Sequence, residues 1–179
     1  NMAEHFGSST ALMGLSVGVY LGTSAIFQIL VGPLSDRIGR RTVSLWALII
    51  FIVVSISCVY APNTFVFMCL RALQAIAACT FVVARAIVRD TTETQASGSK
   101  IAYISMGTAI CPMFGPALGG LMDGWFGWEA NFWFIGGLGL FILVIAYFDL
   151  GETVPENTQG FRQQFSEYPE LLLSRRFWG

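Results

Sequence analysis

The chain has 179 residues, of which 55% are hydrophobic and only 12% are charged, and its formal net charge is −1. Soluble proteins carry about 25% charged residues, so this composition excludes an ordinary soluble domain. Its mean hydropathy is +0.65, and the apolar residues form runs long enough to cross hydrocarbon, which takes about 20 helical residues. The sequence therefore predicts an integral membrane protein, with the lipid bilayer as a partner and no nucleic acid.

Apolar segments follow one another along the chain, with short connectors between them. Their uniform apolarity does not alternate as barrel strands must, and a backbone in lipid has to satisfy its own hydrogen bonds, so the segments are predicted to be helices. The expected spans are residues 11–34, 42–60, 65–87, 101–121 and 130–148. We therefore predict an all-α integral membrane fold, with a transmembrane bundle over residues 1–148.

Basic residues alternate between the connectors and predict the orientation of the bundle. Connectors 35–41 and 88–100 contain Arg or Lys, as does the polar segment 149–179, whereas connectors 61–64 and 122–129 contain neither. Cytoplasmic loops are enriched in Lys and Arg. The N-terminus is therefore expected on the periplasmic side of the membrane, and the tail on the cytoplasmic side.

The segment 149–179 is expected to follow the bundle as a cytoplasmic loop. Its apolar residues recur at helical spacing, which favours an amphipathic helix lying in the inner interface; a mobile linker is the alternative. The stripe consists of Phe161, Phe165, Tyr168 and Leu172. The chain begins with Asn1 and ends in a basic and aromatic sequence typical of the approach to another span, so we expect an internal fragment.

The turn between the first two spans combines glycines with charges. Gly32 and Gly39 allow close approach and unusual backbone angles. Asp36 and Arg40 are four residues apart and can pair if this stretch is helical, and the carboxylate could also face the N-terminus of another helix. The alternative is a basic anchor that only sets the topology.

The whole turn resembles the signature that the major facilitator superfamily carries between its second and third helices (G-x-L-a-D-r-x-G-r-k-x-x-l). The residues that fit are Gly32, Leu34, Asp36, Arg37, Gly39, Arg40, Arg41 and Leu45. Residues 71–74 resemble the fourth-helix element R-x-x-Q-G, although Ala75 replaces its glycine. Residues 115–120 resemble G-P-x-x-G-G of the fifth helix, typical of proton antiporters, and residues 83–90 resemble the Bcr/CflA group of drug:proton antiporters.

This resemblance implies a major facilitator-type helix bundle, namely an N-terminal half that lacks its first helix. It implies a proton-coupled secondary transporter of the bacterial inner membrane that exports drugs or amphipathic small molecules by alternating access. Its partners would be the substrate, protons and the C-terminal half of the same transporter, and no cofactor or metal is expected. The four cysteines are isolated in apolar runs without metal-ligand spacing.

The resemblance also implies roles for particular residues. Asp36, Arg40 and Asp90 would form a conformational latch, within a loop motif that includes Gly32, Arg37, Gly39 and Arg41. Arg71 and Gln74 would take part in proton coupling, although an arginine near the outer interface can also simply snorkel. The fifth-helix motif would seal the two halves against leak, or pack as a kinked helix. Its residues are Gly115, Pro116, Gly119 and Gly120.

Polar residues within the spans are candidates for a substrate cavity, although each could equally be a satisfied helix contact. Besides Arg71 and Gln74 they are Tyr20, Gln28 and Tyr103. No Asp or Glu lies inside the predicted spans, and Glu129 stands where many relatives have arginine. An importer of sugars or metabolites and a non-transporting protein of the same fold remain alternatives. A membrane enzyme is disfavoured, because the carboxylates form no catalytic cluster.

Overall fold

The computed structural model describes residues 6–92 and 94–151, and every regular element in these residues is a helix. The tail stripe at Phe161, Phe165, Tyr168 and Leu172 lies outside the described residues. The elements in chain order are α2 (Thr10–Ile38), α3 (Arg40–Val59), α4 (Thr64–Gln74), the 3-10 turn η1 (Ala75–Ala78), α5 (Cys79–Thr91), α6 (Thr94–Phe126) and α7 (Trp128–Asp149).

Five rods in the described residues are long and apolar enough to cross a membrane, with α4, η1 and α5 together forming the third. The rods extend beyond the apolar segments expected from sequence, most clearly in α6, which has 33 residues. At about 1.5 Å per residue such a helix is about 50 Å long, whereas the hydrocarbon core is about 30 Å thick. The helices therefore continue through residues that were expected to be connectors.

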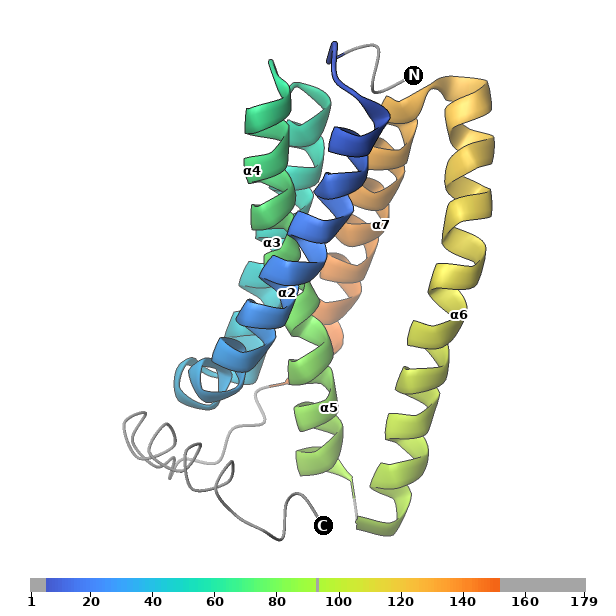
Figure 1. The fold of residues 1–179 in the computed structure, drawn as a ribbon. Coiled ribbons are helices and arrows are strands. Elements are labelled where there is room, and N and C mark those ends of the chain that lie inside the picture. Colours follow the sequence, from blue (N-terminus) through green and yellow to red (C-terminus); the bar gives the residue numbers. More distant parts are fainter. Residues whose placement is uncertain (1–5, 93, 152–179) are drawn as a thin grey trace, which may run out of the picture.

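The rods run antiparallel to their chain neighbours, side by side along one direction (Figure 1). One end of the bundle is where α2, α5 and α7 end and where α3 and α6 begin. We call it the basic end, because the described arginines and lysine of both basic connectors belong to it: Arg37, Arg40, Arg41, Arg89 and Lys100.

Glycines make the two shortest connections between rods. Gly39 alone separates α2 from α3, with φ of +106°, and Gly127 alone separates α6 from α7, with φ of +83°. These angles lie in the region that L side chains rarely adopt. The α4 rod begins differently, since the side chain of Asn63 accepts a hydrogen bond of 2.9 Å from the backbone N–H of Val66 and caps the helix.

Two glycines of α7 allow it to pack closely against α3, in the most extensive helix pair of the bundle. A Cβ added to Gly136 would meet Ile56 at 3.6 Å, whereas one added to Gly139 would meet Phe51 and Ile52 at 3.0 and 3.1 Å. Small residues at such positions let helix backbones approach in lipid. The adjoining core cluster near the opposite end consists of Val54, Cys58, Ala61, Phe67, Trp128 and Phe132.

The remaining helices are packed unevenly. The α2 helix packs along α4, η1 and α5, where Ala75 is fully buried and Ala78 nearly so. The α6 helix makes its main contacts with α7 and α5, and none of the residues in its most apolar stretch is buried. Figure 1 shows α6 standing at the side of the bundle. Most of its surface therefore meets lipid or other protein.

The close contact at Gly139 predicts the effect of enlarging this residue. In Gly139→Leu the added side chain must displace Phe51 and Ile52, and overpacking of this kind typically costs about 1–3 kcal/mol. We expect a lower midpoint of thermal unfolding for the purified full-length protein in detergent. The matched control is Gly137→Leu, because a Cβ at Gly137 meets nothing within 4 Å. Equal midpoints for the two variants would contradict the packing described here.

Candidate functional site

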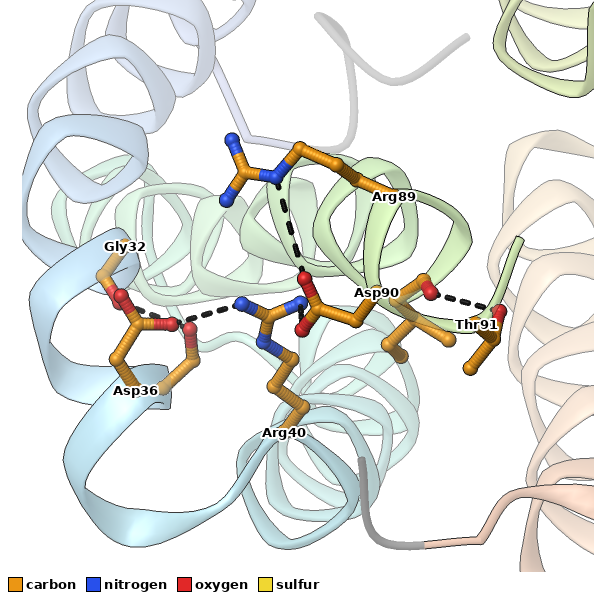
Figure 2. Close-up of polar contacts among 8 residues, drawn as sticks. Gly32, Asp36, Arg40, Arg89, Asp90 and Thr91 are labelled. Carbon is orange, nitrogen blue, oxygen red and sulfur yellow. Dashed lines mark hydrogen bonds and ion pairs between the residues drawn. The ribbon is translucent and has the colours of Figure 1, made fainter. Parts of the chain in front are cut away.

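The three residues of the expected latch lie together at the basic end (Figure 2). Arg40, the first residue of α3, pairs with Asp36 of α2 at 3.1 Å and with Asp90 of α5. Its side chain keeps only 6% of its exposed area, compared with 30% for Asp36 and 21% for Asp90. The guanidinium thus joins the ends of three helices, which we call the Arg40 triad.

Helix dipoles make each charge of the Arg40 triad dependent on the others. Arg40 lies at the N-terminus of α3, and Asp36 and Asp90 lie in the last turns of α2 and α5. A cation is disfavoured at the N-terminus of a helix and an anion at its C-terminus. The mutual pairing therefore offsets three unfavourable placements. Moving one helix end away would leave an unfavourably placed charge without its partner, so the triad holds the three helix ends in one arrangement.

The other residues of the loop motif surround the triad. The carbonyl of Gly32 accepts a hydrogen bond of 2.9 Å from the Ser35 hydroxyl. Arg37 is exposed, whereas Arg41 extends to the end of α7, where its Nη2 donates to the Tyr147 carbonyl at 3.0 Å and its guanidinium lies 5.5 Å from the Tyr147 ring centre. The α3 N-terminus is therefore tied to both α5 and α7.

A second polar cluster is built around Arg71, within the span formed by α4. Arg71 donates to the side-chain oxygen of Gln74, which in turn donates to the hydroxyl of Ser55 on α3 at 2.7 Å. The Ser55 hydroxyl donates to the Phe51 carbonyl at 2.6 Å. Gln74 and Ser55 are almost completely buried. Because an uncompensated guanidinium is unfavourable in a membrane, this relay explains how α4 accommodates Arg71.

Aromatic rings cover the Arg71 guanidinium. It lies 5.1 Å from the ring centre of Tyr20 on α2 and 6.0 Å from that of Phe132 on α7. Both distances are within the range of cation–π attraction. Arg71 also lines a cavity of about 310 Å³ that reaches Ser16 and Asn131. Tyr20 and Arg71 are thus brought together from different rods.

The fifth-helix motif lies on α6, which stays helical through Pro112 and Pro116. Gly115, Pro116 and Gly120 are exposed. Gly119 contacts the neighbouring α7, because its carbonyl accepts a hydrogen bond of 3.2 Å from the Asn131 side chain. A Cβ there would lie 3.4 Å from the Asn131 side-chain oxygen.

The other two candidate cavity residues do not join the Arg71 cluster. Gln28 is half-buried on α2 and makes no side-chain hydrogen bond within the described residues, and Tyr103 on α6 is 68% exposed. Sequence reasoning missed Ser55, Asn131 and Tyr147. A single serine or asparagine in an apolar run was the only signal for the first two, and Tyr147 contributes a backbone carbonyl that no residue pattern marks.

The relay predicts that Gln74 stabilises the bundle through Arg71. In Gln74→Leu the guanidinium loses its acceptor and Ser55 loses its donor, and hydrogen bonds to charged groups contribute about 1.5–3 kcal/mol. We expect a lower unfolding midpoint in detergent. Gln28→Leu makes the same chemical change at a site without such bonds and should leave the midpoint unchanged. If both variants unfold alike, the relay does not stabilise the protein.

Comparison of the sequence with known families identifies one family. The sequence matches the profile of the Major Facilitator Superfamily over residues 1–179. It is 32% identical over 177 residues to the multidrug resistance protein MdtL of Escherichia coli O139:H28 (strain E24377A / ETEC), and equally to MdtL of Shigella flexneri. These alignments cover 98% of this chain and 45% of each relative, so the chain spans about half the length of the curated relatives it matches.

Among solved structures, the chain resembles a bacterial homolog of the human lysosomal transporter Spinster, crystallised in an inward-facing and unoccupied conformation. The TM-score is 0.70 at 20% sequence identity, and the match covers 99% of this chain and 44% of that one. At this identity the likeness shows the fold alone. The profile match over the whole chain, with the five membrane-length rods, shows that the chain belongs to the Major Facilitator Superfamily of membrane transporters.

Proposed function

We propose that the chain forms most of the N-terminal half of a proton-coupled secondary transporter, which exports drugs or amphipathic small molecules across the bacterial inner membrane. The multidrug resistance proteins that it matches over 98% of its length support export of this kind. The positive-inside rule supports a cytoplasmic position for the basic end and a periplasmic position for the opposite end.

The observation that carries the proposal is the Arg40 triad. It joins α2, α3 and α5 through one buried guanidinium and leaves Asp36 the more exposed of its two carboxylates. A carboxylate at this surface suits the positive N-terminus of a helix in the other half. Such a contact would hold the basic end closed and would be lost when the halves separate, as alternating access requires.

The Arg71 cluster supports coupling to protons. A fixed positive charge inside a span stabilises a nearby carboxylate in its ionised form. Within the described residues the acidic side chains lie near the ends of the rods, so the carboxylate that exchanges a proton would be supplied by another part of the transporter. The cavity beside Arg71 is lined by Phe67 and Phe132, and these rings suit amphipathic substrates.

Export in exchange for protons predicts a specific response to the proton gradient. Everted membrane vesicles that contain the full-length protein should accumulate ethidium when respiration acidifies their interior, and a protonophore should abolish the accumulation. Vesicles without the protein set the background. Uptake that follows only the solute gradient and ignores the protonophore would identify a carrier of another kind.

The latch role predicts that Asp36→Asn impairs transport without removing the protein from the membrane. Loss of the charge weakens both the Arg40 pair and the proposed contact with the other half, and a difference of about 1.4 kcal/mol corresponds to about a tenfold change. We expect ethidium accumulation to fall by about this factor at unchanged abundance. Asp149→Asn, an exposed carboxylate at the same end, is the control. Unchanged transport in Asp36→Asn would refute the latch.

A further inference from the structure

An apolar groove opens between α3 and α7 on the surface of the bundle near the basic end. It is lined from α3 by Thr42, Trp46 and Ile49, and from α7 by Val144, Tyr147 and Phe148. The residues Thr42 to Ile49 extend over about 10 Å of helix. We call this feature the α3–α7 groove.

The side chains of the α3–α7 groove remain uncovered by the described residues. Trp46 is 61% exposed, Val144 is 49% exposed and Phe148 is 83% exposed. In Figure 1, α3 and α7 lie behind α2, the helix whose end carries Asp36. The groove is lined by α3 and α7 and not by the end of α2 that carries Asp36, and membrane hydrocarbon is its natural surrounding.

A cation lies at the basic end of this groove. Arg41 contacts the groove residue Tyr147 twice, through the carbonyl at 3.0 Å and through the ring at 5.5 Å. Within residues 6–92 and 94–151 its side-chain hydrogen bond runs from Nη2, and its Nη1 keeps its donor capacity. An apolar channel that ends at an arginine with remaining donor capacity matches the chemistry of a phospholipid, with an acyl chain in the channel and a phosphate at the cation.

The charges around Arg41 favour an anionic lipid over a zwitterionic one. The described carboxylates at this end are Asp36, Asp90 and Asp149, and the first two are paired with Arg40. They are outnumbered by the basic residues of the same rod ends, which are Arg37, Arg40, Arg41, Arg89 and Lys100. Basic pockets between helices on the cytoplasmic side attract anionic headgroups, whereas the ammonium of a zwitterionic lipid is repelled by this surplus.

We propose that the α3–α7 groove binds an anionic phospholipid of the inner leaflet, with its phosphate on Arg41 and one acyl chain along Trp46 and Val144. The proposal rests on the membrane orientation proposed above, but not on transport. Trp46 suits this place, because tryptophan is enriched where hydrocarbon meets the headgroups.

Native mass spectrometry of the purified full-length protein, titrated with phosphatidylglycerol or phosphatidylethanolamine, tests the proposal. We expect one phosphatidylglycerol to bind more tightly than phosphatidylethanolamine. Arg41→Gln should weaken this binding about fivefold, the size expected for loss of one basic side chain at an anionic lipid. Arg85→Gln removes the same charge from α5, outside the groove lining, and should bind like the wild type.

A second variant separates lipid binding from the contact between Arg41 and Tyr147. Val144→Trp fills the groove, keeps every charge, and should also reduce phosphatidylglycerol binding. Equal binding of both lipids by the wild type would overturn the anionic assignment. Binding retained in both Arg41→Gln and Val144→Trp, or a groove occupied by a second copy of the protein, would overturn the site. These outcomes do not depend on ethidium transport, so failure of the lipid site and failure of the transport proposal are distinguishable.

Discussion

The basic end of the bundle depends on one buried guanidinium. Arg40 is 6% exposed at its side chain and lies at a helix N-terminus, where neither burial nor the helix dipole favours a cation. The carboxylates of Asp36 and Asp90, which come from two different helices, offset this cost. The ends of α2, α3 and α5 are therefore coupled, because moving one helix end away leaves a charge without its partner. Gly39 adds to this constraint, because a one-residue connection leaves α2 and α3 little freedom to separate.

Hydropathy predicted the number and order of the rods, because lipid imposes the same apolar requirement on every span. It did not predict where the helices end, since backbone hydrogen bonding continues beyond the hydrocarbon, as in residues 88–91 of α5 and 122–126 of α6. It also gave no indication of the 3-10 turn at Ala75–Ala78. That turn lies in a stretch of uniformly apolar residues against α2, where no residue pattern distinguishes 3-10 from α-helical hydrogen bonding.

The sequence predicted those contacts of the candidate site that join residues close to each other in the chain. The pairing of Asp36 with Arg40 follows from their spacing on a helical turn, whereas the position of Asp90 beside them was implied only by the family resemblance. The partners of Arg71 likewise include one residue near in sequence and several from other rods. Gln74 lies one turn away on the same helix, but Ser55, Tyr20 and Phe132 come from three other rods. Such contacts depend on how the helices pack, and packing through residues such as Gly139 carries no distinctive sequence signal.

These contacts make α3 the helix to which the others are tied. Arg40 joins it to α2 and α5, Arg41 to α7, and Ser55 to Gln74 of α4. Polar contacts of this kind are strong in a medium of low dielectric constant, so α2, α3, α4, α5 and α7 are expected to move as one body. The exposed faces of α2 and α6 are different. A Cβ added to Gly14, Gly18 or Gly22 on α2 would meet nothing within 4 Å, and the apolar stretch of α6 has no buried residue. In alternating access the two halves of the transporter move against each other. The contact between them that changes should therefore lie along α2 and α6, where small residues let another helix approach closely.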